Sequence, residues 1–407
     1  MEVDSMIIKN GVIISPFEIL HRLDIVVNKD TILGFKPTGS YISEDKIIDA
    51  ANCYVCPGLV DIHTHGGGGS DFMDATYEDY SNVLRFHSAN GTTSILTSTV
   101  AAPVEQICKT LILTKELKNR VVSGCRILGA HLEGPFLSKK NRGAHVEDYL
   151  ITPENGYRFV KENSDVIINA TISPELPGSI KMIRDLVDWG IIVSGGHDDA
   201  ADNEVRAAID AGLTNLTHLF CAMSSVANKH GTRCVGLTEI GLIDDRLSVE
   251  LIADNHHLPP ELVRLAYKCK GPQKACVVSD CLRAGGMPVD GTVYTLGSKY
   301  DERSQRFVAA GDVASLPDGS RLAGSVQPIG RMVKNLVEDC GIPLVDAVCM
   351  ASYTPAKVIR KEHTIGSIAP GKKADFCIMD QNLIPVMTIV DGNIVYSKHA
   401  ENNERRA

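Results

Sequence analysis

The amino-acid sequence predicts a (β/α)8 TIM-type barrel that carries a small β-sandwich domain formed by both chain termini. Strand-like apolar runs alternate with helical patterns through the middle of the chain, as in barrels of parallel strands. Short alternating segments broken by turn residues occupy both ends. We therefore expect a barrel over residues 57–359 and a sandwich over residues 1–56 and 360–400.

The two chain ends share one pattern of short strands separated by turns. Near the N-terminus, Ile7-Ile8 precedes Asn10-Gly11, and similar runs follow at 24–27 and 32–34. The segment 374–396 resumes this pattern, so we expect antiparallel strands from both ends to build one domain. The polar last residues, from Lys398 to Ala407, are expected to fray.

The middle of the chain contains eight candidate strands with helices between them. The candidate strands are residues 59–62, 94–98, 126–130, 166–172, 191–194, 214–217, 248–252 and 275–278. The helical patterns are residues 77–89, 103–118, 180–189, 204–211, 260–268, 328–339 and 344–359. Residues 286–324, which are rich in Gly, Asp and Val, predict a β-hairpin insertion near the end of the barrel.

Composition and charge exclude several classes of function. The 407-residue chain has a net charge of −9 and no basic stripe, which argues against a nucleic-acid partner. No run approaches the roughly 18 apolar residues of a membrane helix, and the start does not read as a secretory leader, so we expect no membrane partner. Twelve scattered cysteines in a chain of this length indicate reduced thiols and a cytoplasmic protein.

The first candidate strand ends in two histidines, His63 and His65. In an extended strand, residues two apart point to the same side, so both imidazoles can hold one metal ion. The four glycines at 66–69 leave the backbone open for a ligand to approach. Imidazole and carboxylate ligands suit Zn or Fe, and water held by such an ion is nucleophilic near neutral pH.

Four further ionisable residues follow strand ends, where the active sites of such barrels lie. Glu133 follows the third strand, His197 the fifth, His218 the sixth and Asp280 the eighth. Glu133 and the two histidines form the set found in hydrolytic metal sites, and the carboxylate can bridge two ions. Asp280 is the predicted general base or acid. The structural alternatives are a salt bridge for Glu133, core histidines, and a helix N-cap for Asp280.

Other side chains near these strand ends are candidates for substrate contacts. His257, or its neighbour His256, ends the seventh strand and is suited to polarising a substrate carbonyl. His145 lies on the loop after the third strand, and it either binds a substrate hydroxyl or is an exposed loop histidine. Cys221 and Cys281 are interpreted as small buried side chains, because no motif of a nucleophilic serine or a phosphate loop occurs.

These residues lie in segments by which the chain resembles the N-acetylglucosamine-6-phosphate deacetylases of the amidohydrolase superfamily. The matching segments, of which the run Leu132-Glu-Gly-Pro-Phe136 is quite specific, are residues 57–61, 129–136, 142–145, 173–175, 218–223, 251–257, 277–280, 322–325 and 371–375. The resemblance implies hydrolysis of the acetamide of an amino sugar, first of all N-acetyl-D-glucosamine 6-phosphate, to D-glucosamine 6-phosphate and acetate. It also implies a homodimer with one or two divalent ions, Zn or Fe, in each subunit.

The resemblance also implies roles for individual residues. The implied metal ligands are Glu133, His197 and His218 for a principal ion, with His63, His65 and Asp280 for a second. The implied catalytic residues are Asp280 as acid and base and His257 near the acetyl carbonyl. The implied contacts to the sugar are His145, His257, Cys221 and Ala222.

One departure from the family pattern concerns the phosphate group. Family members bind the 6-phosphate through an asparagine, which is Cys221 here, and an arginine that typically reaches in from the partner subunit in an Arg-Glu-Pro-Gly sequence absent here. Lys229, His230 and Arg233 of the same loop are the candidate replacements, although a lysine or a shifted arginine does not copy a bidentate fork.

The substrate therefore stays open at this stage. Alternatives are N-acetylgalactosamine 6-phosphate or an unphosphorylated N-acetyl amino sugar. A more distant alternative substrate is a cyclic amide. The alternative to an enzyme is a catalytically silent, metal-stabilised binding or regulatory protein.

Overall fold

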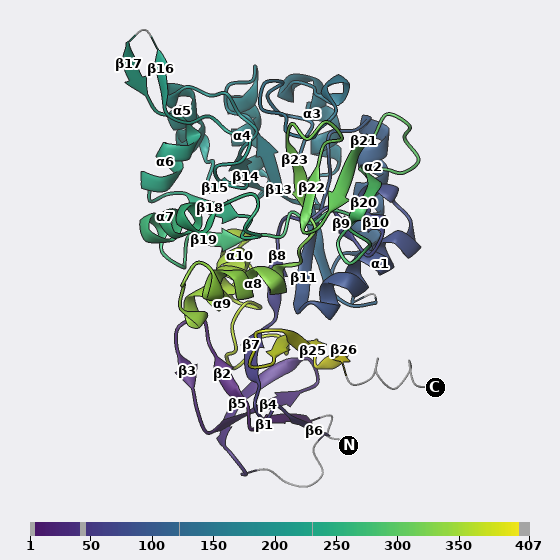
Figure 1. The fold of residues 1–407 in the computed structure, drawn as a ribbon, viewed down its shortest axis with the longest axis vertical. Helices are drawn as coiled ribbons and strands as arrows, with labels where there is room; N and C mark the ends of the chain where they lie inside the picture. Colours follow the sequence, from purple (N-terminus) through teal and green to yellow (C-terminus); the bar gives the residue numbers. More distant parts are fainter. Residues whose placement is uncertain (1–4, 41–45, 122, 230, 399–407) are drawn as a thin grey trace.

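The computed structural model describes residues 5–40, 46–121, 123–229 and 231–398, and it has a barrel standing on a smaller β-sandwich (Figure 1). The predicted fold class is confirmed. The expectations for the first four residues, for the tail after Lys398 and for His230 lie outside the described residues. In the part of the chain that the structure describes, no helix combines the length and the apolarity needed to cross a bilayer.

Eight parallel strands form the barrel wall in the order in which they occur along the chain. They are β8 (Leu59–Asp61), β11 (Thr92–Ser98), β12 (Arg126–Leu132), β13 (Ile167–Ile172), β14 (Ile192–Gly195), β15 (Asn215–Leu216), β18 (Ser248–Leu251) and β19 (Ala275–Val277). All residues of β11 and β12 are buried, as expected for strands covered on both faces. Each predicted strand position holds one of these strands.

Helices cover the outer face of the barrel (Figure 1). They are α1 (Tyr77–Ala89), α2 (Val104–Leu117), α3 (Pro153–Glu162), α4 (Ser179–Asp188), α5 (Asp202–Ala211), α6 (Leu237–Ile243), α7 (Pro260–Lys270), α8 (Ile329–Glu338), α9 (Leu344–Ala351) and α10 (Tyr353–Val358), with the 3-10 turns η1 (Phe72–Asp74) and η2 (Glu147–Tyr149). The starts follow local rules: the Thr76 side chain caps α1 by accepting from the backbone N–H of Asp79, and α3 and α7 begin with a proline.

The predicted helix over residues 344–359 is wrong in one respect, because it divides into α9 and α10 at Ser352. Ser352 leaves the helical region, with φ −134° and ψ −68°, and its hydroxyl donates to the carbonyl of Val348. Pro355 has no N–H to donate to the carbonyl of Ala351, and its ring crowds that carbonyl. The break follows from these two residues.

The sandwich consists of two sheets that bury apolar side chains between them. One is β5 (Thr31–Pro37), β4 (Leu23–Asn28), β1 (Ser5–Lys9) and β6 (Lys46–Asp49); the other is β26 (Asn393–Ser397), β25 (Pro385–Val390), β24 (Phe376–Met379), β7 (Tyr54–Pro57), β2 (Val12–Ile14) and β3 (Ile19–Leu20). Their shared core includes Ile8, Ile25, Val55, Phe376 and Ile389. The pairs β1–β6 and β2–β7 are parallel, which corrects the expectation of antiparallel strands only.

Residues 286–324 form more than the single hairpin predicted. They contain most of a four-stranded antiparallel sheet, which is made of β20 (Asp290–Leu296), β21 (Gln305–Ala310), β22 (Val313–Ser315) and β23 (Leu322–Ser325). Arg283 fastens this sheet to the barrel, because its guanidinium pairs with Asp74 at 3.1 Å and donates to the carbonyls of Thr295 and Gly297. Two small ribbons complete the fold, β9 (Gly66–Gly67) with β10 (Ser70–Asp71) and β16 (Ala227–Lys229) with β17 (Thr232–Cys234).

A buried ion pair joins the barrel to the sandwich. Arg126, at the start of β12, donates to both oxygens of Asp375 at 2.8 and 3.0 Å and lies 2.7 Å from the carboxylate of Asp391. The Arg126 side chain is almost fully buried, so these two carboxylates replace water as the hydrogen-bond partners of its guanidinium. The interaction fixes the sandwich against the first residue of a barrel strand that leads to the site.

Replacing Arg126 with Met should lower the unfolding temperature, because it leaves two carboxylates without their buried partner, a loss of roughly 3–5 kcal/mol for a broken buried pair. Calorimetry measures the change. The matched control is Arg158→Met, which breaks the exposed pair with Glu162 and should leave the unfolding temperature unchanged. Equal effects of both substitutions would contradict the assigned role of Arg126.

Candidate active site

A cavity of about 430 Å³ opens at the carboxyl ends of the barrel strands. This volume suits a small molecule, and the position is that of active sites in this fold. The polar lining includes His65, Glu133, Asn141, His145, His197, His218, His257, Asp280 and Arg321, and the apolar lining includes Val100, Phe220, Ile252 and Leu296. The strand-end residues singled out in the sequence therefore meet in one place.

Glu133 lies at the centre of this cluster. Its two carboxylate oxygens, Oε1 and Oε2, face two different groups of side chains. Oε1 lies 3.2 Å from Nε2 of His197 and 3.1 Å from Nε2 of His218, and these two nitrogens are 3.0 Å apart. Three ligand atoms at this spacing can surround one divalent cation, with Zn–N and Zn–O distances near 2.0–2.2 Å.

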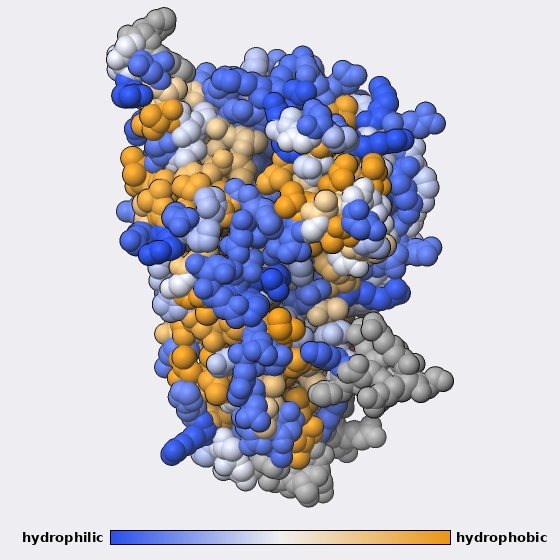
Figure 2. Space-filling model, in the orientation of Figure 1, coloured by the Kyte–Doolittle hydropathy of each residue, from blue (hydrophilic) through white to orange (hydrophobic). Residues whose placement is uncertain are grey.

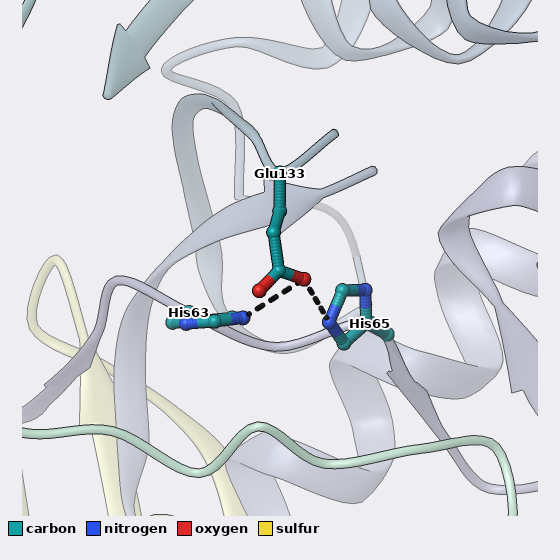
Figure 3. Close-up of side chains that lie close together, drawn as sticks. All are labelled: His63, His65 and Glu133. Atoms are coloured by element: carbon teal, nitrogen blue, oxygen red, sulfur yellow. Dashed lines mark ion pairs between the residues drawn. The ribbon is translucent and has the colours of Figure 1, made fainter. Parts of the chain in front are cut away.

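The second oxygen of Glu133 faces the first-strand histidines (Figure 3). Oε2 lies 3.0 Å from Nε2 of His65 and 3.3 Å from Nε2 of His63. Asp280 approaches the same two nitrogens, with Oδ1 at 3.1 Å from His65 and 3.5 Å from His63. These four side chains can hold a second cation, with Glu133 bridging between the two positions.

The hydrogen bonds of the ring nitrogens on the far side show which imidazoles are prepared as ligands. Nδ1 of His197 donates to the carbonyl of Asn141 at 2.9 Å, and Nδ1 of His63 lies 3.1 Å from the Glu250 carboxylate. In both rings the proton is then on Nδ1, so the Nε2 lone pair faces Glu133. This is the arrangement in which an outer partner orients a metal-binding histidine.

His145 has the opposite arrangement. Its Nδ1 accepts the backbone N–H of Ala101 at 3.1 Å, so in the neutral ring the proton is on Nε2, which points to Oε2 of Glu133 at 3.6 Å. Burial lowers the pKa of His145 to about 4, so the ring is neutral near pH 7. His145 is therefore a hydrogen-bond donor in the cavity and is not prepared to bind a cation.

The electrostatics of the cluster fit a bound cation. Burial opposes the charge of Glu133, but His63 and the other imidazoles hold its pKa well below the usual value. Burial likewise opposes protonation of His65, yet Asp280 and Glu133 raise its pKa to about 9. Nε2 of His63 is buried and makes no hydrogen bond within the described part of the chain. Two buried carboxylates are unfavourable unless positive charge compensates them. The nitrogen and oxygen atoms around them form a ligand set that fits a divalent metal ion.

The backbone turns sharply where it presents several of these side chains. His197, His218 and Asp280 have positive φ values of 49°, 29° and 45°, and Phe220 and Ala222 follow with 75° and 46°. Non-glycine residues seldom adopt this left-handed region, which costs of order 1–3 kcal/mol at each position. Stability is given up at the strand ends to direct these groups into the cavity.

Of the two adjacent histidines after the seventh strand, His257 lines the cavity and His256 is exposed. Nδ1 of His257 lies 2.8 Å from Oδ2 of Asp254, whose other oxygen accepts from the backbone N–H groups of both histidines. Burial opposes a charge on His257, but Asp254 outweighs it and raises the pKa. Nε2 of a protonated His257 can donate to a ligand.

Of the remaining residues predicted to contact the substrate, some line the cavity and others do not. Cys221 and Ala222 line the cavity, and burial raises the pKa of the Cys221 thiol to about 12, so it is neutral. Arg233 does not line the cavity of its own chain, because it is exposed on the β16–β17 ribbon, which projects from the barrel (Figure 1). His230 and the side chain of Lys229 lie outside what the structure describes.

Three residues of the site had no assigned role from the sequence: Glu250, Asn141 and Arg321. Glu250 is a fully buried carboxylate in β18, flanked by two apolar residues, and this alternation is a signal for a side chain that points into the barrel. Asn141 acts through its backbone carbonyl, which no residue pattern reveals. Arg321 lies far along the chain from the strand-end residues, directly before β23.

A barrel with a terminal β-sandwich and a buried His/carboxylate cluster at its strand ends defines the class of divalent-metal-dependent hydrolases. The chain matches the sequence profile of the amidohydrolase family over residues 54–395. It is 34% identical over 342 residues to the N-acetylglucosamine-6-phosphate deacetylase of Vibrio furnissii, covering 84% of this chain and 82% of that one.

Identity to the enzyme of the same name from Bacillus subtilis is 32% over 408 residues, covering 98% and 99% of the two chains. The crystal structure of N-acetylglucosamine-6-phosphate deacetylase from Pasteurella multocida superposes with a TM-score of 0.87 at 30% identity, covering 96% and 99%. The chain thus belongs to the amidohydrolase superfamily and, within it, to the N-acetylglucosamine-6-phosphate deacetylase family.

Substitution of single histidines should separate ligands from donors. His197→Ala removes a nitrogen whose lone pair faces Glu133, so the purified protein should lose much of its bound metal. His145→Ala removes a ring whose proton faces Glu133, so metal content should stay at the wild-type level. Elemental analysis by mass spectrometry after gel filtration measures both. Equal metal content in the two variants would contradict the tautomers deduced from Asn141 and Ala101.

Proposed function

We propose that this protein hydrolyses the acetamide of N-acetyl-D-glucosamine 6-phosphate to D-glucosamine 6-phosphate and acetate. The observation that carries the proposal is the Glu133 cluster with Asp280 at the cavity wall, in a chain whose relatives bear the name of this activity. Residues 57–359 are assigned as the catalytic barrel, and residues 1–56 and 360–400 as the sandwich that supports it.

We assign the principal metal position to Glu133 Oε1, His197 and His218, and a second position to Glu133 Oε2, His63, His65 and Asp280. The ligand set is compatible with Zn or Fe. The chemistry supplied by a divalent cation here is Lewis acidity, which polarises a carbonyl and lowers the pKa of water.

Asp280 is assigned as the group that moves the proton. Its Oδ1 lies 3.1 Å from His65 and the residue lines the cavity, so the carboxylate borders both the ligand set and the substrate space. Burial alone would raise the pKa of Asp280, but His63 and His65 lower it, which leaves a carboxylate ready to accept a proton. Asp280 takes the proton from the attacking water as the oxygen bonds to the carbonyl carbon, and it returns that proton to the nitrogen as the C–N bond breaks.

Two histidines are assigned to the substrate. His257, held by Asp254, donates from Nε2 to the carbonyl oxygen, where negative charge develops in the transition state. His145 presents Nε2–H beside Glu133 and is suited to a sugar hydroxyl. The apolar lining of Phe220, Ile252 and Leu296 limits access of further water.

Acetate release tests the proposed function directly. The metal-loaded protein should hydrolyse N-acetylglucosamine 6-phosphate with a higher kcat/KM than N-acetylgalactosamine 6-phosphate or N-acetylglucosamine. Asp280→Asn should reduce kcat by about 10²- to 10⁴-fold, because it removes the proton acceptor. Asp290→Asn, which replaces an exposed residue at the start of β20, is the control and should keep the wild-type rate.

A wild-type protein that releases no acetate from any of these sugars would refute the proposed function and favour a silent binding protein. Preference for the galactosamine sugar would change the substrate and leave the reaction in place. Substantial activity in Asp280→Asn would remove the assignment of the base only.

We further propose that the protein is a homodimer joined at the face beside the β16–β17 ribbon. Three apolar side chains gather there on the surface: Val226 is 53% exposed, Val235 37% and Ile243 73%. Orange apolar surface lies beside that ribbon at the upper left of Figure 2. An uncovered apolar group of this kind is typical of an interface.

Sedimentation equilibrium should give twice the chain mass of 44.0 kDa at micromolar concentration. Ile243→Lys should shift the protein toward monomer, since it places a charge in the proposed interface. The control Leu33→Lys replaces an exposed leucine on β5, far from the proposed interface in the sandwich domain and 56% exposed, and should leave the mass unchanged. A wild-type monomer at this concentration would contradict the dimer.

A cytoplasmic location is also proposed. All twelve cysteines lie in the described part of the chain as free thiols, including the Cys53 and Cys56 pair that is spaced Cys-x-x-Cys. Free thiols in this number suit a reducing compartment. Fractionation of the source cells tests the location, and recovery outside the cytoplasm would contradict it.

A further inference from the structure

One cationic side chain stands apart from the rest of the cavity. Among the described residues, Arg321 is the only lysine or arginine that lines it. The carboxylates of Glu133 and Asp280 line the same space, and the chain as a whole carries a net charge of −9. An anionic group entering this cavity therefore meets repulsion except where Arg321 or a bound cation offsets it.

Arg321 is not committed to any ion pair. No carboxylate of the described residues lies within 4.0 Å of its guanidinium, and its one side-chain hydrogen bond is a long one of 3.4 Å from Nη1 to the carbonyl of Gly143. The nearby Asp318 is engaged with the backbone N–H and hydroxyl of Ser320. Arg126 and Arg283, by contrast, spend their donors on buried carboxylates. Most of the N–H donors of Arg321 are thus available to a ligand.

The contact to Gly143 separates the guanidinium from one candidate metal ligand, His197, by a single residue. Gly143 packs directly on the His197 ring, since a Cβ atom added to it would lie 3.0 Å from Cε1 of His197. Arg321 itself directly precedes β23, whose residues Leu322, Ala323 and Gly324 line the same wall of the cavity. A sugar bound at the metal-binding side chains would therefore share the cavity with Arg321, which forms part of its wall.

We propose that Arg321 is the residue by which this protein recognises the phosphate of its substrate. The proposal rests on the proposed function and specifies how its substrate class is selected. A guanidinium presents donors in a planar fork that matches two phosphate oxygens, and such charge-assisted bonds are among the strongest in proteins. Arg321 thus supplies, from within the same chain, a charge that Cys221 cannot. The rival is Arg233, which is exposed on β17 and reaches a cavity only from a partner subunit.

The test compares paired substrates in paired variants. Arg321→Ala should lower kcat/KM for N-acetylglucosamine 6-phosphate by roughly 10- to 100-fold, the loss expected for a charged hydrogen bond. The same variant should change kcat/KM for N-acetylglucosamine by less than about 2-fold, because that sugar has no phosphate to lose a contact. Arg321→Lys should be intermediate, since it keeps the charge and loses the fork. Arg306→Ala, an exposed arginine on β21 outside the cavity lining, is the matched control.

Three outcomes would overturn the proposal. Equal losses for both sugars would mean that Arg321 only supports the loop at Gly143. No loss in Arg321→Ala together with a loss in Arg233→Ala would transfer the role to the partner subunit. No loss in either variant would leave phosphate recognition to other groups and exclude Arg321.

A binding measurement keeps this test independent of turnover. Calorimetric titration with D-glucosamine 6-phosphate and with D-glucosamine should show a phosphate-dependent gain in affinity that Arg321→Ala removes. If the wild type releases no acetate from any sugar, the proposed function fails, while the titration still decides on Arg321. Equal affinity of wild type and Arg321→Ala for D-glucosamine 6-phosphate would refute the role of Arg321.

Discussion

The carboxylate of Glu133 is the group on which the rest of the structure depends. It is almost fully buried, yet five imidazoles, those of His63, His65, His145, His197 and His218, approach its two oxygens within 3.0 to 3.6 Å. A buried charge without partners is strongly unfavourable, so this carboxylate constrains every strand end that surrounds it. Because each oxygen faces a different pair of imidazole nitrogens, one side chain organises both candidate metal positions.

Outer contacts extend this constraint through the barrel. Glu250 in β18 fixes the ring of His63, the carbonyl of Asn141 fixes His197, and Asp254 fixes His257, so two loops and one strand interior determine where lone pairs and N–H groups point. The strained turns after β14, β15 and β19 follow barrel strands that are almost entirely buried, and this packing holds the turns in place. The sheet of β20–β23, tied down by Arg283, then closes one side of the cavity and contributes Arg321.

Much of the fold and the cluster follows from local pattern. The barrel strands are apolar runs of limited length, and His63, Glu133, His197, His218 and Asp280 each follow one directly, so the topology of a barrel brings them to one end without further information. As the two-residue spacing of His63 and His65 predicts, both imidazole rings point to the same side and approach the same oxygen, Oε2 of Glu133. These features depend only on the order of residues within single segments.

Other features depend on contacts between distant segments and are not readable from the chain. The tautomer of His145 is set by an N–H 44 residues away, and Arg321 meets Gly143 across 178 residues. The break at Ser352 arises from a hydroxyl and a proline that compete with a strong apolar helical pattern. Whether His256 or His257 faces the site is decided by Asp254, which binds the His257 ring and leaves His256 outside.

The most direct test of the central role of Glu133 is anomalous X-ray diffraction from crystals of the catalytically active, metal-loaded protein. We expect an anomalous peak in contact with Oε1 of Glu133 and Nε2 of His197 and His218, at ligand distances near 2.0–2.2 Å. A second peak, where present, should contact Oε2 of the same carboxylate. Active crystals whose metal ions lie elsewhere, with Glu133 binding none of them, would contradict this account.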